Sequence, residues 1–65
     1  MKLIKQKILL ILAEKGLTKA ALADRMGVTR QHLSTIMKRE TCTPVTAGKL
    51  AKGLGVAVTE IVKED

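Results

Sequence analysis

The fold is decided by residues 17–37, which read LTKAALADRMGVTRQHLSTIM. Apolar residues recur there at spacings of three or four, which places them on one face of a helix. These inward positions are Leu22, Met26, Leu33 and Ile36. Between the two apolar runs stands Gly27, which suits the left-handed backbone at a helix end. The sequence therefore predicts two short helices joined by a tight turn, each with one buried face.

Threonines stand where three helices are expected to begin. Thr18 and Thr29 can each accept a hydrogen bond from an amide of the first turn that has no partner within the helix. Thr43 precedes Pro44, and proline is preferred in the first position of a helix. This last helix should run from about Pro44 to Leu54. Its inward residues would be Ala47, Leu50, Ala51 and Leu54.

Two more helices are predicted near the ends of the chain. Residues 2–15 form the first, and its core stripe would be Ile4, Ile8 and Ile11. Val56 and Ile61 have the five-residue spacing of a hydrophobic staple, which predicts a terminal helix from about Val58 to Lys63. The expected fold is all-α, with five helices.

Composition narrows the class of protein. The 65 residues make one domain at most, over residues 1–65, and a 46% apolar content argues against disorder. A single cysteine, Cys42, allows no internal disulfide, and with one histidine it offers no zinc set. The longest apolar run, from Ile8 to Ala13, is too short for a membrane span. We therefore expect a cytoplasmic protein that has no cofactor and no metal ion and does not associate with a membrane.

The charge pattern favours a polyanionic partner. The formal net charge is +6, and residues 1–57 carry 11 basic and 3 acidic side chains. Each neutralised phosphate releases counterions, so a positive domain favours nucleic acid. The chain has no Phe, Tyr or Trp on which unpaired bases could stack, which favours duplex DNA. The acidic residues are scattered and form no group of nucleophile, base and orienting residue, so an enzyme is not expected.

Several segments, in this order, resemble the Cro and phage-repressor helix-turn-helix family of prokaryotic transcription regulators. They are Leu17-Thr18, Leu22-Ala23, Met26-Gly27-Val28-Thr29, Leu33, Ile36 and the stretch LAKGLGV at 50–56. The resemblance runs over nearly the whole chain. It implies a compact five-helix, lambda-repressor-like DNA-binding domain, with the motif at about 18–38. The helix from about Thr29 to Lys38 would enter the major groove, usually in a homodimer on a palindromic operator.

The resemblance also implies two sets of DNA contacts. The base-reading residues would be Thr29, Arg30, Gln31, His32, Ser34 and Thr35. The phosphate-binding residues would be Thr18, Lys19, Lys38, Arg39 and Thr41. Three features depart from the family pattern: Lys19 stands where Gln is common, Leu12 where Arg is common, and Met37-Lys38-Arg39 where a Glu-Asn-Gly-like ending is common. The last leaves the geometry of the loop after the recognition helix open.

These features favour a DNA-binding transcriptional regulator, most simply a repressor. A second interpretation is an antitoxin-like module that binds a partner protein and also its own operator. Helix one carries Leu3, Leu9 and Leu10 on faces away from its core stripe; they are either covered by neighbouring helices or form a homodimer seam. Lys49 and Lys52 are interpreted as solubilising residues. The sequence assigns no role to Cys42.

Overall fold

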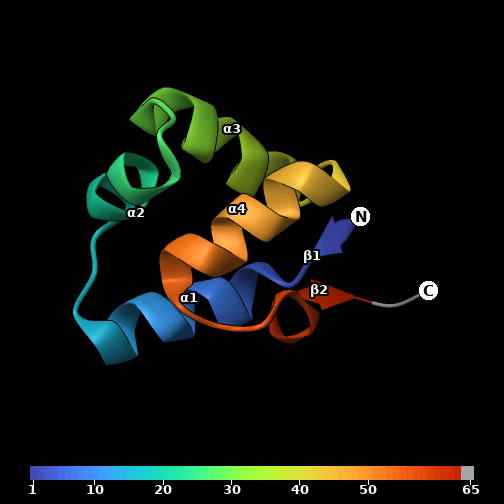
Figure 1. The fold of residues 1–65 in the computed structure, drawn as a ribbon, viewed down its shortest axis with the longest axis horizontal. Helices are drawn as coiled ribbons and strands as arrows, with labels where there is room; N and C mark the ends of the chain where they lie inside the picture. Colours follow the sequence, from blue (N-terminus) through green and yellow to red (C-terminus); the bar gives the residue numbers. More distant parts are fainter. Residues whose placement is uncertain (64–65) are drawn as a thin grey trace.

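The computed structural model describes residues 1–63 and is mostly helical (Figure 1). Its elements, in order, are β1 (Lys2–Leu3), α1 (Lys5–Lys15), α2 (Lys19–Met26), α3 (Arg30–Arg39), α4 (Pro44–Leu54), the 3-10 helix η1 (Val58–Glu60) and β2 (Val62–Lys63). In Figure 1, α4 crosses the middle of the molecule, with α1 below it and α2 and α3 on the other side. The small sheet, formed by β1 and β2, lies at one end of the molecule in Figure 1.

The predicted threonine caps are confirmed. The hydroxyl oxygen of Thr18 accepts from the amide of Ala21 at 3.1 Å, and that of Thr29 accepts from the amide of His32 at 3.0 Å. Thr43 does the same for Thr46 at 3.3 Å, with Pro44 in the first turn of α4. Each cap is worth about 1 kcal/mol, since it satisfies an amide that the helix cannot.

The helix ends include one that the sequence pattern did not predict. Gly27 ends α2 with φ 72°, as expected, and the amide of the next residue, Val28, reaches back to the carbonyl of Ala23 at 3.0 Å. By contrast, α3 ends on Glu40, a non-glycine residue with φ 58°. A β-carbon in this left-handed conformation is disfavoured by about 1–2 kcal/mol. The loop after α3 therefore keeps a left-handed turn without the glycine or asparagine that suits it.

The prediction of a helix over residues 2–15 is wrong at its start. Lys2 and Leu3 form a strand, and α1 begins only at Lys5. The amide of Leu3 donates to the carbonyl of Glu40 at 2.7 Å, and that of Ile4 donates to Ile61 at 2.8 Å. These partners are remote in sequence, so no local pattern could reveal them.

The predicted helix from Val58 to Lys63 is also wrong. Val58–Glu60 forms one turn of 3-10 helix, and Val62–Lys63 is a strand antiparallel to β1. Leu3 lies opposite Val62, and Lys2 lies opposite both Lys63 and, on its other side, Thr41. The part of the chain that is described thus has four α-helices instead of five, because its last residues pair with β1.

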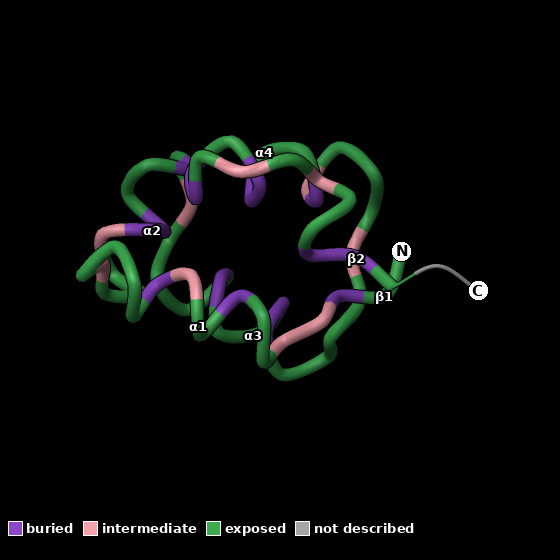
Figure 2. The backbone as a smooth tube through the Cα atoms, turned by 90° about the horizontal axis from the view of Figure 1, so that it is seen from below, coloured by how far each residue is buried: buried purple, intermediate pink, exposed green. Residues whose placement is uncertain are grey.

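The core lies between the helices and draws on every element except η1 (Figure 2). Its fully buried larger side chains are Ile8, Leu22, Leu33, Leu50, Leu54 and Ile61. The predicted inward residues of α2, α3 and α4 are all buried. In α1 the stripe is shifted: Ile8 is buried as predicted, but Ile4 and Ile11 are half-buried and Leu12 is 5% exposed. Leu12 is therefore a core residue, although the predicted stripe did not include it.

Two leucines of α1 remain outside this core. Leu10 is 60% exposed and Leu9 is 38% exposed, whereas Leu3 is 6% exposed because it belongs to β1. Neighbouring elements therefore cover Leu3, and it cannot belong to a homodimer seam together with Leu10. The exposed large apolar residues of α1 are Leu9 and Leu10.

Candidate nucleic-acid interface

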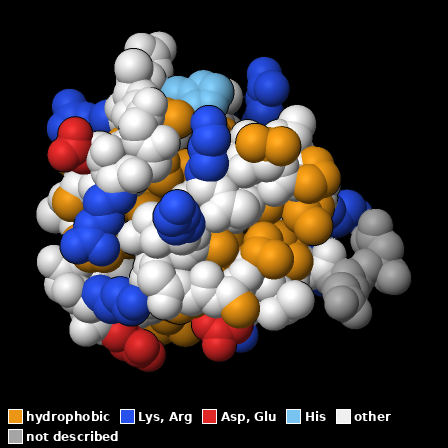
Figure 3. Space-filling view, viewed as in Figure 1, with side chains coloured by type: hydrophobic (Ala, Val, Ile, Leu, Met, Phe, Trp, Pro, Cys, Tyr) orange, Lys and Arg blue, Asp and Glu red, His pale blue; other side chains and the backbone are white. Residues whose placement is uncertain are grey.

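The outer side of α3 carries the predicted base-reading residues. Leu33, Ile36 and Met37 turn inward and hold the helix on the core. The opposite side is polar and exposed, and it consists of Arg30, Gln31, His32, Ser34, Thr35 and Lys38. Figure 3 shows the histidine at the upper edge of the molecule, where Figure 1 places α3. The helix thus presents a polar, positively charged ridge to solvent.

Two threonines of this set use their hydroxyl groups within the helix. Thr29 Oγ1 accepts from the amide of His32 at 3.0 Å, so its first function is to cap α3. Thr35 Oγ1 donates to the carbonyl of Gln31 at 3.0 Å. Thr35 therefore offers a methyl group and an oxygen lone pair to a partner, and its donor is already in use. The side-chain hydrogen-bonding groups of the ridge that are not used within the helix belong to its other members, Arg30, Gln31, His32, Ser34 and Lys38.

The candidate phosphate contacts lie at the start of α2 and at the end of α3. Thr18 caps α2 through its hydroxyl and Lys19 is the first residue of that helix; both are exposed. Their position combines a lysine charge with the amide groups of a helix N-terminus. Lys38 and Arg39 are exposed in the last turn of α3, so they also favour its C-terminal carbonyls.

A groove lies between α3 and the loop that follows it. Its volume is about 220 Å³, and its lining residues are His32, Thr35, Ile36, Arg39, Thr41, Cys42, Thr43 and Thr46. The structure thereby brings together two predicted base-reading residues, His32 and Thr35, and two predicted phosphate residues, Arg39 and Thr41. His32, Thr35 and Arg39 share one face of α3, and the loop that follows adds Thr41 to it.

The groove also contains hydroxyl groups that the sequence interpretation did not count as site residues. Thr43 caps α4 and hydrogen-bonds to the hydroxyl of Thr46 at 3.0 Å, beside Thr41 and Arg39. The motif of Thr43 followed by Pro44 was interpreted only as a helix start. A cap positioned after the recognition helix was the available signal, because helix N-termini attract anions.

Cys42 is half-buried and lines the same groove. Burial raises the pKa of its thiol above the ordinary value, and the N-terminal ammonium acts in the opposite direction with a smaller effect. The ammonium itself donates to the carbonyl of Cys42 at 2.9 Å. The thiol therefore stays protonated near neutral pH and lacks the thiolate character of a reactive cysteine.

Comparison with known protein families agrees with this geometry. Residues 7–61 match the profile of a helix-turn-helix family, which covers most of the chain. The chain belongs to this helix-turn-helix family of the Cro and phage-repressor type. Comparison with curated proteins and with solved structures gives no significant match.

Family membership defines the general class of function. The chain is a DNA-binding regulator of transcription, and the partner of such a domain is double-stranded DNA. The family is not typically enzymatic. Among residues 1–63, the longest helices have 11 residues, and none is long and apolar enough to cross a bilayer.

Proposed function

We propose that this protein is a sequence-specific repressor that reads the major groove of its operator with α3. The observation that carries the proposal is the division of α3 into a buried apolar side and an exposed polar side. Such a helix is held rigidly by the core while its outer side chains are available to base edges. The protein would act in the cytoplasm. Bound at a promoter, it would block access of the transcription machinery to the DNA.

The side chains of the ridge suit direct readout of bases. Arg30 can donate two parallel hydrogen bonds to guanine, and Gln31 can pair with adenine through its amide. The Thr35 methyl group can contact the methyl group of a thymine, which agrees with the use of its hydroxyl within the helix. Thr29, His32 and Ser34 complete the proposed base-reading set.

The phosphate contacts would fix the register of α3 in the groove. Thr18 and Lys19 lie at the start of α2, and Lys38, Arg39 and Thr41 lie after the reading residues of α3. Contacts on both sides of a recognition helix hold it in one orientation and carry no sequence information. These five residues should therefore govern affinity for all duplexes.

We further propose that the protein binds a palindromic operator as a homodimer. One helix-turn-helix domain reads only a short half-site, and two-fold symmetry doubles the number of base pairs that are read. The exposed leucines of α1, Leu9 and Leu10, supply the apolar seam for the second copy.

The same leucines favour a second candidate function, an antitoxin-like protein that neutralises a partner and regulates its own operon. In that case, Leu9 and Leu10 would contact the partner protein instead of a second copy. Sedimentation of the purified protein separates the two: a dimer that becomes monomeric in Leu9→Lys/Leu10→Lys favours the homodimer. A wild-type monomer that copurifies with a small protein favours the antitoxin.

The function itself is tested by selecting binding sites from random duplexes, followed by binding measurements on variants. Arg30→Ala should lose about 1–3 kcal/mol on the selected site and almost nothing on other sequences. Lys38→Ala should weaken binding to all sequences alike and reduce the salt dependence. Lys7→Ala, an exposed lysine of α1, is the matched control and should bind like the wild type. If no consensus emerges, or if Arg30→Ala binds its site like the wild type, the proposal is wrong.

A further inference from the structure

A positively charged cleft opens between the last turns of α2 and the C-terminal half of α4. Its volume is about 460 Å³, and its lining residues are Arg25, Met26, Lys49, Lys52 and Gly53. Three of these five are cations and, among the residues described, no carboxylate lines the cleft. It shares no residue with the candidate nucleic-acid interface. We propose that this cleft is a docking surface for an acidic segment of a partner protein.

One cation of the cleft has a function within the fold. Arg25 Nη1 donates to the carbonyl of Gly53 at 3.3 Å and so satisfies one of the carbonyls that the end of α4 leaves open. Lys15 does the same from outside the cleft, by donating to the carbonyl of Leu54. The charge of Arg25 is therefore explained by helix capping, with its aliphatic stem lying along the cleft.

The two lysines of α4 that line the cleft, Lys49 and Lys52, are less well explained by the fold than Arg25 is. Lys52 lies in the last turn, where its charge favours the helix dipole, but Lys49 lies one turn earlier and gains nothing from it. Both are exposed, and they lie three residues apart on α4. Together with Arg25 they place three like charges around one cleft, an arrangement that a negatively charged partner would stabilise.

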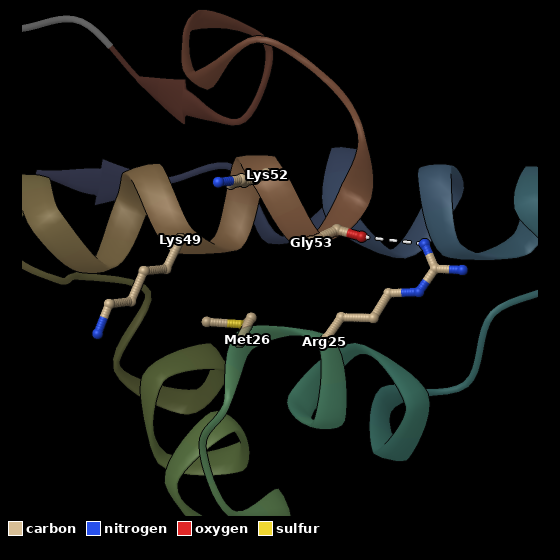
Figure 4. Close-up of a pocket in the computed structure, with 5 residues that line it drawn as sticks. All are labelled: Arg25, Met26, Lys49, Lys52 and Gly53. Atoms are coloured by element: carbon tan, nitrogen blue, oxygen red, sulfur yellow. Dashed lines mark hydrogen bonds between the residues drawn. The ribbon is translucent and has the colours of Figure 1, made fainter.

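The floor of the cleft favours a protein segment over a nucleic acid. Figure 4 shows Met26 between the side chains of Lys49 and Arg25, with the backbone of Gly53 facing it. Because Gly53 has no side chain, α4 packs closely against α2 here, and Met26, which is only 8% exposed, forms an apolar floor between the cations. An adaptable methionine accepts an apolar side chain, and the surrounding cations accept carboxylates. A segment that alternates acidic and apolar residues offers both, whereas a phosphate backbone offers only charge.

The proposal is independent of DNA recognition by α3. Its test is a titration of isotope-labelled protein, followed through backbone amide resonances, with a dodecapeptide of repeated Glu-Leu-Asp. A second peptide, with Gln and Asn in place of the acids, controls for apolar binding. The acidic peptide should shift the amides of Arg25, Met26 and residues 49–53, and the neutral peptide should not.

Variants decide whether the cleft or the overall charge is responsible. Lys49→Gln/Lys52→Gln should bind the acidic peptide about fivefold more weakly or worse, since two exposed ion pairs are lost. The control Lys5→Gln/Lys7→Gln removes the same charge from α1 and should change the affinity little. Unchanged thermal unfolding of both variants ensures that the comparison concerns the surface.

Three results would overturn the proposal. The first is that the peptide shifts only the amides of α3, and the second is equal weakening by the two lysine pairs, which would mean attraction by net charge alone. The third is that a random-sequence DNA duplex shifts residues 49–53 more strongly than the peptide does, in which case the cleft belongs to a second DNA contact.

Discussion

Two glycines of α4 allow the packing argument to be tested with the same substitution. Gly48 is exposed, and a β-carbon built on it meets nothing within 4 Å. Gly53 is buried, and its β-carbon would lie 3.0 Å from Leu22 Cδ1 and 3.3 Å from Met26 Cγ. In sequence terms both residues weaken the helix equally, by about 1 kcal/mol relative to alanine.

The two substitutions should therefore change the free energy of unfolding differently. Gly48→Ala should raise the free energy of unfolding by about 1 kcal/mol, and the melting temperature by about 4–8 °C, because it gains helix propensity and meets no obstacle. Gly53→Ala gains the same propensity but must displace Leu22, which is 0% exposed and packed in the core. Overpacking of this kind costs about 1–3 kcal/mol, so the net change should range from nearly zero to a loss of about 2 kcal/mol.

Thermal and urea unfolding, followed by circular dichroism, measure both variants against the wild type. Gly48→Ala serves as the internal control for helix propensity. If Gly53→Ala stabilises the protein as much as Gly48→Ala does, the close contact between α2 and α4 is not a constraint and the reasoning fails.

Three further predictions concern the turn after α3, the helix crossing and the thiol. Glu40→Gly should stabilise the protein by about 1 kcal/mol by relieving φ 58°, whereas Glu40→Ala, which removes the same charge, should not; equal stability of the two in urea would contradict this. Ala23→Trp should abolish cooperative thermal unfolding, since Ala23 is 2% exposed at the crossing of α2; an unchanged melting temperature refutes it. Because burial raises the pKa of Cys42, iodoacetamide at mildly alkaline pH should alkylate the folded protein more slowly than the urea-unfolded one; a faster folded-state rate would oppose this.

Much of the helix-turn-helix could be predicted because its signals are local. Thr18, Thr29 and Thr43 act on amides three residues away, and Gly27 ends α2 through bonds to the preceding turn. The spacing of apolar residues in α2, α3 and α4 is also a local signal. It identified the buried residues because each helix packs only one face against the core. The polar side of α3 followed directly from that division.

The polar side of α3 could be predicted from the sequence, but the groove that it forms with the following loop could not. The site positions along α3, including the shared face of His32, Thr35 and Arg39, follow from the periodicity. The groove that adds Thr41 and Thr46 to this face depends on how the loop folds back. The use of the Thr35 hydroxyl within the helix likewise requires coordinates. The left-handed turn at Glu40 also requires coordinates, because a glutamate ordinarily favours a negative φ.

The amino-acid sequence alone determined the capped helices, their buried faces and the polar ridge of α3, since each depends on residues within a few positions of one another. Only the tertiary structure decided that Lys2–Leu3 pairs with Val62–Lys63, that Leu12 is buried in place of Ile4, and that Gly53 permits close approach. These features depend on partners far along the chain. Strand pairing and close packing satisfy backbone groups and fill space between elements, and neither leaves a periodic signal in one segment.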